Sequence, residues 1–146
     1  MSHIFDHPIP LGYAVAMVSR IQSSAVKDRL SKFGITFGQL PFLSELLWLD
    51  EPITQDALSK ALFIDPAATA RALEQLEEKG FVTRKINPEN RRQKLVRTTD
   101  KARWIKGELR AELRQTTLET LAPLTTEEQE QLKDLLEKVC LHHAAK

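Results

Sequence analysis

The sequence has few of the features that mark secreted, disulfide-linked or membrane proteins. Its 146 residues include one cysteine, Cys140, which excludes an internal disulfide and favours a reducing compartment. No apolar run approaches the length of a membrane span, and the N-terminus lacks the basic residues and apolar stretch of a secretory signal. We therefore predict a cytoplasmic protein that has no membrane partner.

Motifs that carry catalytic chemistry are also missing. The five glycines are scattered, and there is no phosphate-binding loop, Ser-His-Asp order, paired-carboxylate signature or Cys-x-x-Cys motif. The histidines have no spacing that would fix a tetrahedral metal centre; they are His3, His7, His142 and His143. We expect no enzymatic activity, no bound metal and no cofactor.

Helix-forming residues, in contrast, fill most of the chain. Helices are predicted where apolar residues recur at helical spacing behind a capping residue. They should cover residues 11–30, 36–50, 54–62, 66–79, 99–123 and 125–139, with caps at Thr36 and Gln39, Thr54, Asp65, and Thr125 and Glu128. Gly80 should end the fourth helix in a left-handed conformation. Residues 81–98 are β-formers around a turn at 87–90, so the predicted fold is mainly α with a small β-hairpin wing.

The formal net charge of +1 conceals a strong asymmetry along the chain. Between Lys79 and Lys106 there are ten basic residues against two acidic ones, a net charge of +8. The rest of the chain has 11 basic and 18 acidic residues, a net charge of −7. A basic surface confined to one region is the expected signature of a nucleic-acid contact.

The helix at 66–79 is the predicted DNA-reading helix. Its first turn carries small side chains, including Ala68 and Thr69, which let the backbone approach a duplex closely. Arg71 can reach guanine edges or phosphates, and Gln75, one turn further on, is the next candidate for a contact. Three short helices followed by a charged two-stranded wing are a known way to place one helix in the major groove.

The hairpin carries the second set of predicted contacts. Arg91 and Arg92, at its turn, are suited to a minor groove, whose negative potential attracts guanidinium groups. Lys94 and Arg84 are expected to lie against phosphates. A winged-helix module that binds a protein instead of DNA stays open as an alternative, although such a docking face should be less basic and more apolar.

Nearly the whole chain resembles the multiple-antibiotic-resistance regulators, the MarR/SlyA family. The resemblance is carried by the recognition-helix end and wing, LEQLEEKGFVTRKINPENRRQKLVRTTDKA, by ITFGQLPFL and by TQDALSKAL. It implies one winged helix-turn-helix domain over 1–146, with a DNA-binding lobe at 34–99 and dimerisation helices at 1–33 and 100–146. It also implies a triangular homodimer in which Arg71, Arg91 and Arg92 contact DNA.

Two positions depart from the family pattern. Asn90 stands where the family usually has Asp in an Asp-x-Arg wing brace, so we expect a neutral-acceptor hydrogen bond with Arg92 instead of an ion pair. Ala102 replaces a usual Gly. Neither change removes a predicted DNA contact, but both bear on the rigidity of the wing and on operator preference.

The long helices at both chain ends predict a homodimer, because a lone three-helix module would not need them. The alternative is that they only complete a monomeric core. The expected intersubunit contacts are six apolar residues: Leu11, Val15, Ile105, Leu109, Leu132 and Leu136.

The resulting prediction is a sequence-specific regulator of transcription that binds double-stranded DNA at a pseudo-palindromic operator. Its family resemblance implies a repressor relieved by a small aromatic or phenolic effector, with an activator of the same fold left open. Phe42 and Trp48 are candidates for an effector pocket between the lobe and the arms, although core packing explains them equally. We expect Cys140 to be packed as a small hydrophobic residue, the alternative being an oxidation sensor.

Overall fold

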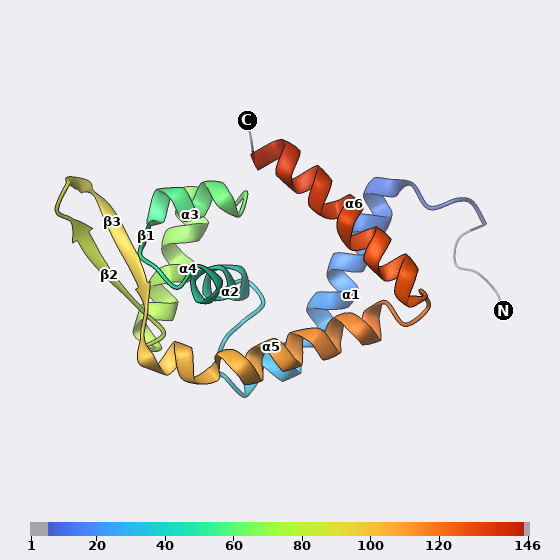
Figure 1. Cartoon of the computed structure of the whole chain (residues 1–146), viewed down its shortest axis with the longest axis horizontal. Helices are drawn as coiled ribbons and strands as arrows, with labels where there is room; N and C mark the ends of the chain where they lie inside the picture. The colour runs from blue at the N-terminus through green and yellow to red at the C-terminus, as the bar shows by residue number, and fades with distance from the viewer. Residues whose placement is uncertain (1–5, 145–146) are drawn as a thin grey trace.

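The computed structural model describes residues 6–144, and α-helices dominate it. Its elements are α1 (Leu11–Ser31), α2 (Leu40–Leu49), β1 (Ile53–Thr54), α3 (Gln55–Ala61), α4 (Pro66–Glu78), β2 (Val82–Asn87), β3 (Asn90–Thr98), α5 (Asp100–Thr120) and α6 (Thr126–Ala144). In Figure 1, α2, α3, α4 and the strands form one lobe, α6 and the start of α1 lie at the opposite end, and α5 runs between the two ends. The predicted mainly α fold with a β-hairpin is confirmed.

Two of the short helices begin at the predicted caps. The Thr54 hydroxyl accepts a hydrogen bond from the amide of Ala57 at 3.1 Å, and the Asp65 carboxylate accepts one from the amide of Ala68 at 2.8 Å. Each bond satisfies an amide that has no partner inside the helix. Gly80 follows α4 with φ +81°, the left-handed conformation predicted for it.

The two predicted capping boxes differ in the structure. Thr125 and Glu128 form a complete box, in which each side chain accepts a hydrogen bond from the other residue's amide, at 2.9 and 3.1 Å. At Thr36, only the Gln39 side chain completes its bond, by accepting from the Thr36 amide at 3.2 Å. Residues 37–39 form a tight turn instead, and α2 begins later than predicted, at Leu40.

The hairpin belongs to a three-stranded antiparallel sheet in the order β1-β3-β2. Ile53 pairs with Val96 on one side of β3, and Arg84 pairs with Val96 on the other. The sequence analysis predicts the hairpin but not β1. Two residues are too few to show an alternating pattern in the sequence. The strand β1 is formed by its hydrogen bonds to β3.

The hydrophobic core joins the lobe to α1 and α5. Leu73 and Leu76 are fully buried on the inner face of α4, and burying each contributes roughly 1.5–3 kcal/mol. The elements that pack around them contribute other buried side chains: Leu30, Phe42, Leu43, Leu46, Leu58, Val96, Ala102 and Leu109. This packing fixes the inner face of α4 and leaves its opposite face to solvent.

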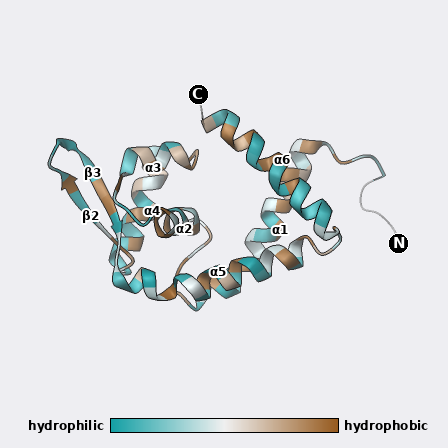
Figure 2. Ribbon diagram, viewed as in Figure 1, coloured by the Kyte–Doolittle hydropathy of each residue, from teal (hydrophilic) through white to brown (hydrophobic). Residues whose placement is uncertain are grey.

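Helices α1 and α6 expose many apolar side chains. Within the described part of α6 no residue is buried, and Leu135, Val139 and Leu141 are more than half exposed. At the start of α1, Leu11 is 81% exposed and Tyr13 68%. Figure 2 shows hydrophobic residues spread along both helices at the end distant from the lobe. Within residues 6–144, no helix is both long and apolar enough to cross a membrane.

Ionic contacts join α1 to α5. Arg29 donates to the Glu119 carboxylate at 2.6 Å, and Lys32 contacts both Glu112, at 2.5 Å, and Glu108, at 3.1 Å. The hydrogen bond from Arg29 lowers the pKa of Glu119. Hydrogen bonds to Glu112 and then Glu108 raise the pKa of Lys32. These pairs link the last turns of α1 to the long helix that carries the lobe.

Candidate nucleic-acid interface

The outer face of α4 presents polar side chains with no helix packed over them. Arg71 and Gln75 are both exposed, four residues apart on this face, and Ala68 is half-buried in the turn before Arg71. Helix periodicity places these residues opposite the buried Leu73 and Leu76. Such a face can enter a major groove, with an arginine at its centre.

Thr69 corrects one prediction. Its side chain is fully buried, and its hydroxyl donates a hydrogen bond to the Asp65 carbonyl oxygen at 2.9 Å. Thr69 lies four and seven residues before Leu73 and Leu76, so it falls on the core face of α4. Its side chain packs inside the lobe instead of lining the DNA-facing surface.

The wing tip exposes two arginines. Arg91 and Arg92 are solvent-exposed at the start of β3, next to the turn. The Asn90 side-chain oxygen accepts a hydrogen bond from the Arg92 backbone amide at 3.1 Å. Asn90 is therefore a neutral acceptor, as expected, but it binds the backbone amide of Arg92 and not its guanidinium. The Arg92 guanidinium is exposed and has no hydrogen-bond or ion-pair partner within residues 6–144, so it is placed to meet an external anion.

Arg84 has a different role from the one predicted. Its side chain is only 12% exposed and forms an ion pair with Glu77 of α4 at 3.2 Å. The Arg84 backbone amide also donates to Glu77 at 3.0 Å, and its guanidinium donates to Gln55 of α3 at 3.4 Å. An arginine held in this way joins the root of the wing to α3 and α4. The prediction that it lies against a phosphate is corrected.

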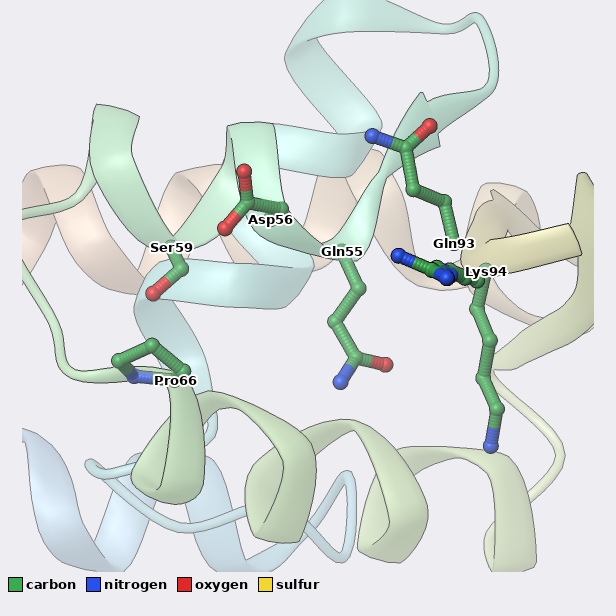
Figure 3. A pocket seen from close by; sticks show the side chains of 7 residues that line it. Gln55, Asp56, Ser59, Pro66, Gln93 and Lys94 are labelled. Carbon is green, nitrogen blue, oxygen red and sulfur yellow. The ribbon is translucent and has the colours of Figure 1, made fainter. Parts of the chain in front are cut away.

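A cavity of about 220 Å³ lies where α3, the start of α4 and β3 meet. Figure 3 shows Gln55 and Lys94 extending toward the ribbon of α4 and Pro66 at the start of that helix. Arg92 also lines the cavity, while Asp56 is its acidic residue. This hollow separates the tip of the wing from the start of α4, so the wing arginines and the exposed face of α4 form distinct surfaces.

Lys85 and Arg97 are exposed basic residues of the wing that the sequence analysis did not assign to a role. Lys85 pairs with Leu95 and Arg97 with Thr83, so both lie on the sheet face opposite Arg84. Alternate residues of a strand lie on opposite faces of a sheet, so the sequence could have placed Lys85 and Arg97 on the face opposite Arg84. Among the described residues, no group of three or more His, Cys, Asp and Glu side chains can hold a metal ion; His3 lies outside these residues.

The residues predicted to contact a second subunit fall into three groups. Leu11, Val15 and Leu136 are 81%, 53% and 49% exposed, so they are free to meet a partner. Leu109 is 2% exposed within the core of the single chain, which corrects its assignment as an intersubunit contact. The remaining two are partly buried, and they are Ile105 and Leu132.

Phe42 and Trp48 do not share a pocket. Phe42 is 1% exposed in the core, while Trp48 is 73% exposed, with the Arg110 guanidinium 5.1 Å from its ring centroid. Six residues along α2 separate them by more than one and a half turns, so they face different ways. Cys140 is exposed in the single chain, so it does not pack inside its own subunit as a small hydrophobic residue.

Two cavities meet at Phe37, between the lobe and α1, where a pocket was expected but with other lining residues. One, of about 290 Å³, is lined by Gln22, Val26, Phe37, Leu40, Leu113, Thr116 and Thr117. The other, of about 380 Å³, is lined by Ser23, Lys27, Ser31, Ile35, Thr36, Phe37 and Gly38. The lining comes from segments more than 70 residues apart in the chain, so no local sequence pattern could have identified it.

Comparisons with known proteins agree with this geometry. A sequence model of the MarR family matches residues 45–94, which cover most of the lobe. The reduced form of MarR from E. coli is 32% identical, with a TM-score of 0.78, and the match covers 92% of this chain and 98% of that one. A MarR transcriptional regulator from Methanosarcina mazei Go1 is 26% identical over 88% of this chain and 92% of that one, with a TM-score of 0.82. The transcriptional regulator SlyA, 23% identical, covers 94% and 96% with a TM-score of 0.82 and shares the fold.

Proposed function

Because the chain belongs to the MarR family of transcriptional regulators, we propose that it binds double-stranded DNA as a homodimer and represses transcription. In this proposal residues 34–99 are the DNA-binding lobe, and residues 1–33 and 100–146 are the dimerisation arms. The observation that carries the proposal is the exposed basic surface of the wing, which lies beside the face of α4 that exposes Arg71 and Gln75, above a core that holds both elements in place.

Helix α4 enters the major groove in this arrangement. Arg71 is directed at base edges or phosphates, and Gln75 lies one turn further along the same exposed face. The half-buried Ala68 at the start of the helix has no long side chain to keep the backbone away from the duplex. Asp65 caps α4, so the first turn of the helix is formed before DNA binds.

The wing contacts the neighbouring minor groove. Arg91 and Arg92 at its tip carry exposed guanidinium groups, which are attracted to the negative potential of a narrow groove. Lys94, exposed on the same strand, binds a phosphate. Arg84 does not take part, since it is occupied by Glu77 at the root of the wing.

A second copy of the chain covers the exposed apolar residues of α1 and α6. Isolated apolar side chains are normal on a protein surface. A helix of 19 residues without one buried residue, however, lacks the tertiary packing that normally stabilises a helix. Leu11, Val15 and Leu136 are the intersubunit contacts in this proposal, with Leu132 at the edge of the interface, whereas Ile105 packs against the core of its own chain. Two-fold symmetry then places two α4 helices about one helical turn of DNA apart, roughly 10 base pairs.

A small aromatic effector relieves repression by occupying the cavities beside Phe37. The first cavity combines apolar walls with Gln22, Thr116 and Thr117, and the second has Lys27 at its edge. Apolar walls with a few polar groups are typical of small-molecule sites. Since the cavities separate α1 from the start of α2, a ligand there changes how the lobe sits on the arm.

A selection from random duplex DNA tests the proposal. Purified protein should enrich a pseudo-palindromic sequence, and it should bind that duplex with two chains per site and with an affinity that falls as salt rises. Failure to enrich any duplex would argue against a DNA-binding role. Repeating the selection with phenolic compounds tests the effector, which should lower the affinity for the enriched duplex.

A further inference from the structure

Gln39 is a buried polar residue at the start of α2. Its side chain is 3% exposed and makes three hydrogen bonds. The amide nitrogen donates to the Gln75 side-chain oxygen at 2.8 Å, and the oxygen accepts from the Lys79 ammonium at 2.9 Å and from the Thr36 amide at 3.2 Å. Burying an amide is costly unless its groups are paired, and here both are.

Two of these bonds end on the recognition helix. Gln75 lies on the exposed face of α4, and accepting a bond from Gln39 leaves its own amide group free to donate elsewhere. Lys79 caps the end of α4, and its carbonyl oxygen accepts a bond from Lys101 of α5. Gln39 therefore helps to fix both the orientation of Gln75 and the end of α4.

The third bond closes the turn that forms the wall of the two cavities. Phe37 lines both cavities, and it stands inside the turn between Thr36 and Gln39. The amides of Gln39 and Leu40 both donate to the Thr36 carbonyl oxygen at 3.1 Å. The Phe37 side chain is 38% exposed, but its backbone lies inside this turn, so a group that shifts the Phe37 backbone distorts the turn to which Gln39 belongs.

We propose that Gln39 couples the position of Phe37 in these cavities to the position of the recognition helix. Displacement of Phe37 opens the Thr36–Gln39 turn, which weakens the bonds to Gln75 and Lys79 and frees the end of α4. A ligand shifts this equilibrium only by binding the open form more tightly than the closed one. The regulatory meaning of this coupling rests on the proposed function, but the coupling itself is a property of the single chain.

A double-mutant cycle tests the coupling without a ligand. Phe37→Ala alters the cavity wall, and Gln39→Met removes all three side-chain bonds while keeping an unbranched side chain of similar length. Gln39→Glu keeps an acceptor for Thr36 and Lys79, and Gln75 can turn its amide to donate to it, so this variant should restore the coupling. Gln22→Met is the matched control, because Gln22 lines the same cavity but bonds to Thr117 of α5, at 3.4 Å.

Two readouts are made on each variant: hydrogen exchange of the α4 amides, and affinity for the selected duplex. Phe37→Ala should raise α4 exchange and weaken duplex binding about fivefold when Gln39 is present, and have less than about a twofold further effect in the Gln39→Met background. The Gln39→Glu and Gln22→Met backgrounds should keep the full effect. Additive effects of Phe37→Ala and Gln39→Met in both readouts would overturn the proposal. If the protein bound no duplex, the proposed function would fail, while hydrogen exchange would still decide the coupling.

Discussion

The contrast between Arg92 and Arg84 is a sharp test of the interface, because both are wing arginines and only one is free. Arg92→Ala removes an exposed guanidinium that is unpaired among the described residues. Arg84→Met removes a guanidinium that is 12% exposed and paired with Glu77, while keeping the apolar stem of the side chain. If Arg92 binds DNA and Arg84 braces the wing, Arg92→Ala should change the salt dependence of DNA binding, and Arg84→Met should instead change the free energy of unfolding.

The expected magnitudes follow from the number of phosphates neutralised. Each phosphate contact contributes about 0.9 to the slope of log affinity against log salt, so Arg92→Ala should flatten the slope by about one. The advantage of the wild type over this variant should then shrink about three- to fourfold between about 50 and about 200 mM salt. Arg84→Met should leave the slope unchanged. Arg84→Met should instead lower the free energy of unfolding by about 1–2 kcal/mol. The loss stays this small because Glu77 still accepts a hydrogen bond from the backbone amide of residue 84.

Fluorescence anisotropy on the selected duplex at four salt concentrations measures the slopes, and urea denaturation measures the stabilities. Lys138→Ala, on α6 and far along the chain from the wing, is a control for loss of one positive charge. A flattened slope for Arg84→Met with unchanged stability would refute the assignment of Arg84 to the wing root. An unchanged slope for Arg92→Ala would remove it from the interface.

Three further predictions follow. Arg71→Ala should cost about 1–3 kcal/mol on the selected duplex and less on random DNA, and equal losses on both in a competition assay would reduce Arg71 to a phosphate contact. Asp65→Ala should lower the free energy of unfolding by about 0.5–2 kcal/mol through loss of the α4 cap, measured by urea denaturation, whereas Asp65→Asn should cost much less. The lowered pKa of Glu119 contributes stability that is present above the ordinary carboxylate pKa and is lost as pH falls through the lower folded value. Glu119→Gln should therefore reduce the fall in melting temperature on going from about pH 5 to about pH 3, and an unchanged pH profile would exclude the Arg29 pair as a contributor.

The local structure of the lobe could be predicted from sequence because its signals are local. Asp65 before Pro66 predicts the start of α4 and Gly80 predicts its end, and both are confirmed. The hairpin follows from β-forming residues on either side of a turn. In each case the residue that carries the signal also makes the bond or adopts the conformation that ends the element.

Features that depend on tertiary contacts could not be predicted in this way. The basic character of Arg84 is visible in the sequence, but its partner Glu77 is on another element and becomes apparent only when β2 packs on α4. Leu109 lies on the apolar stripe of α5 and Phe42 lies in the apolar helix α2, and periodicity alone does not say whether such a face meets its own chain, a second copy or a ligand. The cavities beside Phe37 exist only because α1, α2 and α5 converge there.

The proposed function requires, above all, that two α4 helices and two wings bind one duplex together. The direct measurement is a titration of the selected duplex with the wild-type chain, with mass determined by sedimentation at several salt concentrations. We predict a complex of two chains per duplex whose affinity falls steeply as salt rises. A chain that stays monomeric and has no salt-dependent affinity for any duplex would contradict it.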